Sequence, residues 1–272
     1  MTLFIPIYIF ILGLLIGSFL NVVILRYNTG RGIDGRSGCM QCGYKLRWFD
    51  LVPVFSWLFL RGRCRKCRSK ISIQYPLVEL GTAVLFLGIF LKFQPHVVEP
   101  IFLNLIFIWN ALIVAILMII FVYDIYHKII PNELSYTFAA LAFLQTLYLF
   151  PIHQGIQTID WLNLTSGLLM FLPFWALWAY SKGNWIGLGD GKLALGIGWY
   201  LGFVHAISAI ILAFWIGAIF GIAFLLIDKL KSRSENITMK TEIPFAPFLI
   251  VGLVIEFFWQ LDVVGLGLFF MN

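Results

Sequence analysis

Charged side chains are scarce in this sequence. Asp, Glu, Lys and Arg make up 12% of its 272 residues, whereas hydrophobic residues make up 61%; a typical soluble domain has about 25% charged residues. This composition excludes a soluble globular protein. The net charge of +6 does not indicate a nucleic-acid partner, because the basic residues lie between apolar segments rather than forming a groove. We therefore expect an integral membrane protein in contact with the lipid bilayer.

The first apolar run also lacks the features of a cleavable signal peptide. No basic residue precedes it, and it is longer than the apolar region of a signal peptide. We therefore interpret residues 3–25 as a retained membrane helix.

Long apolar runs occur eight times, and a membrane-spanning helix needs about 20 such residues. The runs are continuous rather than alternating, which favours helices over a β-barrel. The predicted fold is thus an all-α polytopic membrane protein with about eight transmembrane helices. The sixth run is short and rich in glycine, and no clear signal separates it from the seventh near Phe203 to Ala206. The predicted spans are 3–25, 75–92, 101–122, 132–150, 161–180, 190–204, 205–228 and 244–268.

The Lys and Arg residues predict the orientation. The loop between the first two helices is expected to be cytoplasmic, because cytoplasmic loops are enriched in Lys and Arg. The predicted outside loops, near 93–100 and 151–160, have almost none, so both termini are predicted outside. Asp124 then ends the third span and Asp190 begins the sixth, both at the cytoplasmic face. The first loop holds eleven of the nineteen basic residues: Arg26, Arg31, Arg36, Lys45, Arg47, Arg61, Arg63, Arg65, Lys66, Arg68 and Lys70.

That loop also holds all four cysteines, in two C-x2-C pairs separated by 21 residues: Cys39, Cys42, Cys64 and Cys67. This spacing is typical of a zinc-ribbon-like site with four thiolate ligands around one Zn²⁺. Two disulfides are the alternative, and a reducing cytoplasm disfavours them. Four protein ligands leave no open position, so the predicted zinc is structural.

Asp124 and Asp190 are the candidate catalytic residues. A single carboxylate at the end of a span can simply extend to the interface, but two at one depth suggest a pair. Gly187, Gly189 and Gly191 surround the second aspartate and allow close approach. Paired carboxylates share one proton, so one can activate water while the other protonates a carbonyl oxygen. This is the chemistry of aspartic-type peptide hydrolysis.

Other ionisable residues give weaker signals. Glu79 lies one turn inside the second span, where an ion pair and a functional contact are equally compatible with its position. For Glu256 and Asp262 we favour a packing or outer-interface role. We read Lys192 as an interface residue, and His127 as an ordinary loop residue.

Pairs of glycine four residues apart occur at three places in the chain. They would allow helices to approach closely, although chance in a chain with 24 glycines explains them as well. The pairs are Gly13/Gly17, Gly198/Gly202 and Gly217/Gly221.

Several motifs together resemble the bifunctional bacterial type IV prepilin peptidases. They occur in the family's order along nearly the whole chain, with Asn132 and Ala246 as departures where many members have Asp and Gly. The motifs are GSFLNVVILR, the paired C-x2-C knuckles, ISIQYPLVEL, YDIYHKIIPNEL, GLGDGKL and IPFAPFL.

The resemblance implies an aspartic endopeptidase of the bacterial inner membrane that uses Asp124 and Asp190. Its substrates would be prepilins or pseudopilins, cut after a Gly at the cytoplasmic face. It further implies methylation of the new N-terminal residue by S-adenosylmethionine, and the cysteine loop supports this second activity. No G-x-G-x-x-G nucleotide loop is present, so Glu79 is only a candidate for the neighbourhood of the methyl donor. The expected divisions are a first helix (1–25), a cytoplasmic loop with the four cysteines (26–74) and a transmembrane peptidase core (75–272).

Two other functions remain as alternatives. A small proton-coupled transporter would have ionisable residues near mid-bilayer and inverted repeats. A non-catalytic zinc-loop scaffold of a secretion or pilus machine would tolerate the loss of both aspartates. The sequence carries no signal for the oligomeric state, or for whether a pilus, type II secretion or DNA-uptake system is served.

Overall fold

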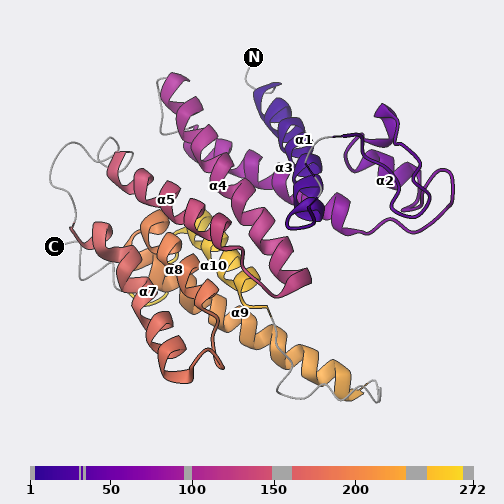
Figure 1. The fold of residues 1–272 in the computed structure, drawn as a ribbon. Coiled ribbons are helices and arrows are strands. Elements are labelled where there is room, and N and C mark those ends of the chain that lie inside the picture. The colour runs from indigo at the N-terminus through magenta and orange to yellow at the C-terminus, as the bar shows by residue number, and fades with distance from the viewer. Residues whose placement is uncertain are drawn as a thin grey trace. The chain divides into compact units, whose positions relative to one another are not determined.

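The computed structural model describes residues 4–30, 32, 35–94, 100–148, 161–230 and 244–265. Regular structure in these residues is helical, and apart from two isolated β-bridges they contain no strand. The predicted all-α fold is therefore confirmed (Figure 1).

A long helix is found at each of the eight predicted spans. Between the first two, the cysteine loop holds the short helices η1 (Trp48–Asp50) and α2 (Phe55–Phe59). The long helices are α1 (Phe4–Arg26), α3 (Gln74–Phe93), α4 (Pro100–His127), α5 (Asn132–Tyr148), α7 (Trp161–Ser181), α8 (Leu188–Leu201), α9 (Phe203–Leu230) and α10 (Ala246–Trp259).

Five of these helices, α1, α3, α4, α7 and α9, are long and apolar enough to cross a membrane. The other three have 17, 14 and 14 residues. A 14-residue helix is only about 21 Å long, which is shorter than the hydrocarbon core of a bilayer, about 30 Å. Length alone therefore does not make α8 or α10 a complete span.

Two predicted helix boundaries need correction. The sequence predicts a helix over 244–268, but α10 ends at Trp259, because Gln260 adopts a left-handed backbone with φ of 47°. The break between α8 and α9 falls at Gly202, just before the predicted interval. Gly202 has φ of 80°, and the side-chain Oδ1 of Asn163 accepts the N–H of Phe203 at 3.1 Å.

Parts of the predicted topology lie outside the described residues. These are most of the predicted outside loops near 93–100 and 151–160, and the basic residue Arg31.

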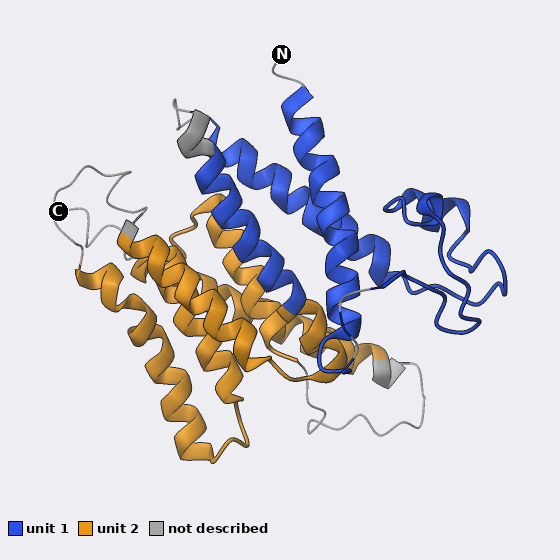
Figure 2. Ribbon diagram, turned by 45° about the horizontal axis from the view of Figure 1, so that its top comes forward, with its two compact units in different colours: residues 1–119 blue, residues 120–272 orange. Residues whose placement is uncertain are grey.

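The chain forms two compact units, residues 1–119 and residues 120–272, and the boundary between them falls within α4 (Figure 2). In the first unit, α1 and α3 pack side by side through glycine. A Cβ added at Gly13 would lie 2.5 Å from Cα of Ala83, and one at Gly17 would lie 2.7 Å from Cα of Glu79. The packing role of this glycine pair is thus confirmed.

In the second unit, α8 packs against α5, α7, α9 and α10. Its residues Leu193, Ala194 and Ile197 have no exposed surface. Gly198 allows the close approach to α7, since a Cβ there would lie 2.6 Å from Cα of Gly167. A helix enclosed in this way buries its backbone and side chains in protein, which explains how a short, glycine-rich segment is stable at this place.

We predict that Gly17→Val destabilises the first unit. The added atoms meet the backbone of α3, and overpacking of this kind typically costs about 1–3 kcal/mol. The measurement is thermal unfolding of the purified protein in detergent. Gly81→Ala is the matched control, because a Cβ there meets only the flexible end of Met118, at 3.3 Å. Equal melting temperatures for the two variants would contradict the prediction.

Candidate active site and metal centre

The two C-x2-C pairs form knuckles with the same backbone pattern, 25 residues apart. In the first, the N–H of Cys39 donates to the carbonyl of Tyr44 and its carbonyl accepts from Gly43. In the second, Cys64 makes the corresponding bonds with Ser69 and Arg68. An isolated β-bridge closes each knuckle, Gly38 with Lys45 and Arg63 with Lys70. The fold of each knuckle thus directs its two thiols to one side.

The four sulfur atoms meet at one point, all within 4.8 Å of one another, and none is in a disulfide. The Sγ atoms of Cys39 and Cys67 are 3.8 Å apart. Four thiolates placed tetrahedrally at a Zn–S distance of about 2.3 Å would be about 3.8 Å apart. The cluster therefore fits one tetrahedral metal ion.

The protonation of these thiols also suits a cation. The backbone amides of Cys42 and Gln41, with the Ser69 hydroxyl, lower the pKa of Cys39 to about 6. At Cys42 the amide of Tyr44 lowers the pKa, but burial and the three neighbouring thiols outweigh it and raise the pKa to about 11. Four adjacent sulfurs thus do not all ionise readily by themselves, and a bound cation would supply the missing positive charge.

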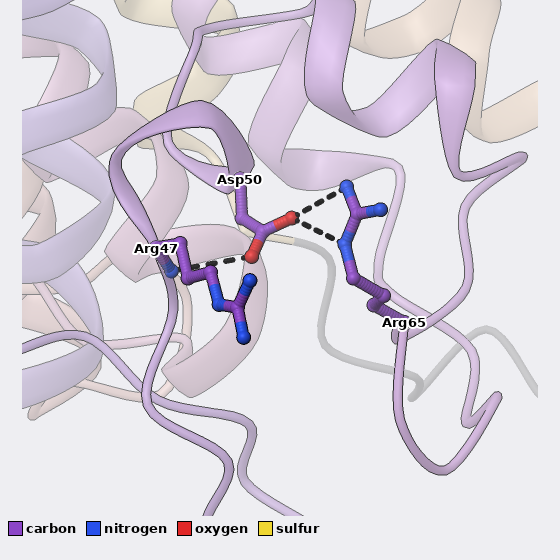
Figure 3. Close-up of polar contacts among 3 residues, drawn as sticks. All are labelled: Arg47, Asp50 and Arg65. Carbon is purple, nitrogen blue, oxygen red and sulfur yellow. Dashed lines mark hydrogen bonds and ion pairs between the residues drawn. The ribbon is translucent and has the colours of Figure 1, made fainter.

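An ion pair organises the chain between the knuckles (Figure 3). Oδ1 of Asp50, on η1, accepts from Nη2 and Nε of Arg65, at 2.8 Å and 2.9 Å. Its Oδ2 accepts the backbone N–H of Arg47 at 3.2 Å. The Asp50 side chain is 1% exposed, and the Arg65 guanidinium also lies 4.9 Å from the centre of the Phe49 ring. This contact holds the first turn after one knuckle against the middle of the other.

Glu79 connects the cysteine loop to α3. Its Oε2 accepts the backbone N–H of Val54 at 2.7 Å. Val54 precedes α2 and has φ of 63°, which is unusual for a β-branched residue. The buried carboxylate therefore satisfies an amide that a strained backbone directs toward it. Of the two interpretations of Glu79, the structure shows a polar contact with the loop, but with its backbone rather than with an arginine.

The two candidate catalytic aspartates lie together in the second unit. Asp124, in the last turn of α4, is 4% exposed. Asp190, in the first turn of α8, is partly exposed, and the two carboxylates interact electrostatically. The backbone amide of Ala246, at the start of α10, faces Asp124, and that of Gly187 faces Asp190. One oxygen of Asp124 is buried and has no hydrogen-bond partner in the described structure.

The segments around Asp190 explain its glycines. A Cβ added at Gly189 would lie 3.0 Å from Cβ of Ile130, in the turn between α4 and α5, and one at Gly191 would lie 3.1 Å from Cβ of Phe174 on α7. A larger residue at Gly189 would push α8 away from the turn that follows Asp124, and one at Gly191 would push it away from α7. The glycines therefore allow the two aspartates to come close.

Three residues for which the sequence analysis predicted no catalytic role make side-chain contacts in the structure. His127 stacks on Tyr123 at 4.2 Å, within α4. Glu256, with no exposed surface, pairs with Nδ1 of His205 at 3.2 Å, a pairing that sequence spacing alone does not reveal. Lys192 contacts α5 and is discussed below.

Comparison with known proteins places the chain in a family. Residues 11–93 match the bacterial peptidase A24 N-terminal domain and residues 111–222 match the type IV leader peptidase family. No solved structure matches. The chain belongs to the type IV leader peptidase family.

Three relatives with the name prepilin leader peptidase/N-methyltransferase illustrate the similarity. The protein of Myxococcus xanthus is 32% identical, with 85% of this chain and 66% of the relative covered, so this chain spans about two thirds of that relative's length. The protein of Xanthomonas campestris pv. campestris is 30% identical over 93% of this chain and 91% of the relative. The protein of Bacillus subtilis is 31% identical over 94% of this chain and 95% of the relative.

We predict that the purified protein contains one zinc ion per chain. Four converging thiolates select a soft divalent metal in tetrahedral geometry. Elemental analysis by mass spectrometry measures the content, and Cys39→Ser with Cys64→Ser should remove it. Phe59→Ala serves as the control, because it changes an exposed side chain of the same loop without removing a ligand. A wild-type protein with no metal but with titratable free thiols would contradict the prediction.

Proposed function

We propose that this chain removes the leader peptide of type IV prepilins or pseudopilins and then methylates the new N-terminal residue. The observation that carries the first activity is the meeting of Asp124 and Asp190, from helices far apart in the sequence, beside backbone amides. Family membership and the names of the relatives support both activities.

The proposed cleavage uses both carboxylates. Two carboxylates at close range hold one proton between them, because joint ionisation is costly. The ionised aspartate takes a proton from water, whose oxygen bonds to the carbonyl carbon, while the protonated aspartate donates to the carbonyl oxygen. Collapse of this tetrahedral intermediate breaks the C–N bond, and the leaving amine takes a proton from the dyad. The step needs no metal, in agreement with a cysteine cluster whose four ligands leave no open position.

The position of the two aspartates near helix ends suits a substrate that is cleaved at the membrane surface. The chain is a multi-pass membrane protein, and each aspartate lies within a turn of a helix end. We infer that both termini are outside and that this end of the helices faces the cytoplasm, as the basic first loop indicates. A leader peptide would then remain in the cytoplasm while the apolar helix of the pilin lies in the bilayer. The scissile bond would lie at the depth of the dyad.

For the second activity we propose that the cysteine loop is required and that Glu79 acts by holding this loop. S-adenosylmethionine supplies the methyl group when bound. The carboxylate of Glu79 is already engaged with Val54, so its proposed role is to fix α2 and the metal-binding knuckles on α3. A structural zinc ion would hold the two knuckles together in the same way.

The alternative functions are less well supported. A transporter would need ionisable groups along a path through the bilayer, whereas the two aspartates lie together. A scaffold without chemistry gives no reason for two aspartates from distant helices to act on each other electrostatically.

We predict that Asp124→Asn and Asp190→Asn each abolish prepilin cleavage, because a dyad that has lost one carboxylate can no longer exchange the proton. Cleavage of a prepilin in liposomes, followed by mass spectrometry, measures this. Glu256→Gln is the control, since it alters a buried acid outside the proposed site. Cleavage at the wild-type rate by both Asn variants would show that the aspartic mechanism is wrong, and absence of cleavage by the wild-type protein would support the scaffold.

We also predict that Glu79→Gln retains methylation and Glu79→Leu loses most of it. Glutamine keeps an oxygen that can accept the Val54 N–H, and leucine does not. Both variants should cleave at the wild-type rate, and the methylated fraction of the processed pilin is read from the same mass spectra. Loss of methylation in both variants would show that the charge of Glu79, rather than its contact with the loop, is needed.

A further inference from the structure

Lys192 makes two contacts that its position in the sequence does not predict. Its Nζ donates a hydrogen bond to Oδ1 of Asn132 at 2.7 Å and lies 4.7 Å from the centre of the Tyr136 ring. Asn132 and Tyr136 belong to the first turns of α5, whereas Lys192 is on the first turns of α8, two residues after Asp190. The ammonium thus joins the start of one helix to the start of another.

This contact is more specific than an ordinary surface lysine contact. A lysine at the membrane interface can extend its charge into water with many rotamers, and a single exposed polar contact contributes little. Here the hydrogen bond and both partners are exposed, but the Lys192 side chain is partly buried, and it donates to an amide oxygen while lying on an aromatic face, so that two interactions together favour one conformation. The arrangement therefore restrains α5 relative to α8.

The restraint reaches Asp124 through a short turn. Asp124 is in the last turn of α4, and only residues 128–131 connect α4 to Asn132. This turn is restrained, because the N–H of Lys128 donates to the carbonyl of Asp124 at 2.8 Å and Pro131 fixes its own φ. Within it, Ile130 lies against Gly189, on the other side of Asp190. The end of α4 is thus held on α8 at two points that flank Asp190 in sequence, Gly189 and Lys192.

We propose that Lys192 is a positioning residue of the peptidase: held by Asn132 and Tyr136, its ammonium fixes the α4–α5 turn on the start of α8 and so sets the separation of the Asp124 and Asp190 carboxylates. This inference depends on the proposed aspartic mechanism. A dyad shares a proton and addresses one carbonyl group only over a narrow range of separations, so loosening the turn lowers the rate of the chemical step rather than substrate binding.

A matched pair at Asn132 tests the contact without altering Lys192. Asn132→Asp keeps an acceptor oxygen in a side chain of the same size, whereas Asn132→Leu removes the acceptor. We expect kcat for prepilin cleavage to fall roughly ten- to hundredfold in Asn132→Leu, as for small misplacements of catalytic groups, with KM unchanged. Asn132→Asp should retain wild-type kcat. Lys192→Met should match Asn132→Leu, and the double variant should be no slower than either single one, because both remove the same contact.

Lys182→Met is the control for the loss of one positive charge, since Lys182 is exposed in the segment between α7 and α8. Rates are compared per folded enzyme, after size-exclusion chromatography in detergent. If Lys192→Met does not fold, the pair at Asn132 decides. Unchanged kcat in Asn132→Leu, a loss of kcat in Asn132→Asp as large as in Asn132→Leu, or a rise in KM at constant kcat would each overturn the inference, the last because it would place Lys192 in contact with substrate. Failure of the proposed function is recognised separately, as cleavage that persists in Asp190→Asn.

Discussion

Close packing of helices around α8 is the constraint on which the proposed active site depends. A carboxylate next to the bilayer is costly unless it has a purpose and a suitable environment. Glycines at the start of α8 allow the turn after Asp124 and the side chains of α7 to lie directly against it. Larger residues there would push the helices apart, and the two carboxylates could then not share a proton as the proposed mechanism requires. The proposed chemistry thus depends on this packing.

The two proposed activities use different parts of the chain. The thiols and Glu79 belong to the unit of residues 1–119, and the aspartates belong to that of residues 120–272. In each unit a buried carboxylate on a long helix faces a backbone amide, that of Val54 for Glu79 and that of Ala246 for Asp124. In both cases an irregular or terminal segment is held by an acid on a long helix. Substitutions can therefore affect one activity while the other continues.

Features that occupy a short stretch of sequence could be predicted. Apolar runs predicted the positions of all eight long helices, and the spacing of cysteines predicted one cluster, because each signal lies within its own segment. Contacts between distant residues could not be predicted in this way. The pairing of Asp50 with Arg65, and of Glu256 with His205, depends on how segments fold back on one another. The end of α10 was predicted wrongly for a different reason: Val263 and Val264 continue the apolar pattern, although the left-handed backbone of Gln260 has already ended the helix.

The cysteine loop begins and ends at almost the same place. Asn21, near the end of α1, donates its side-chain amide to the carbonyl of Tyr75, at the start of α3, at 3.1 Å. The two helices therefore form a hairpin whose ends are already held together, and the residues between them add a separate folded element at its tip. Such an element can be gained or lost as one piece during evolution, because a short turn could close the same hairpin. Modularity of this kind would let a membrane peptidase acquire or discard a second chemistry without rebuilding its helical core.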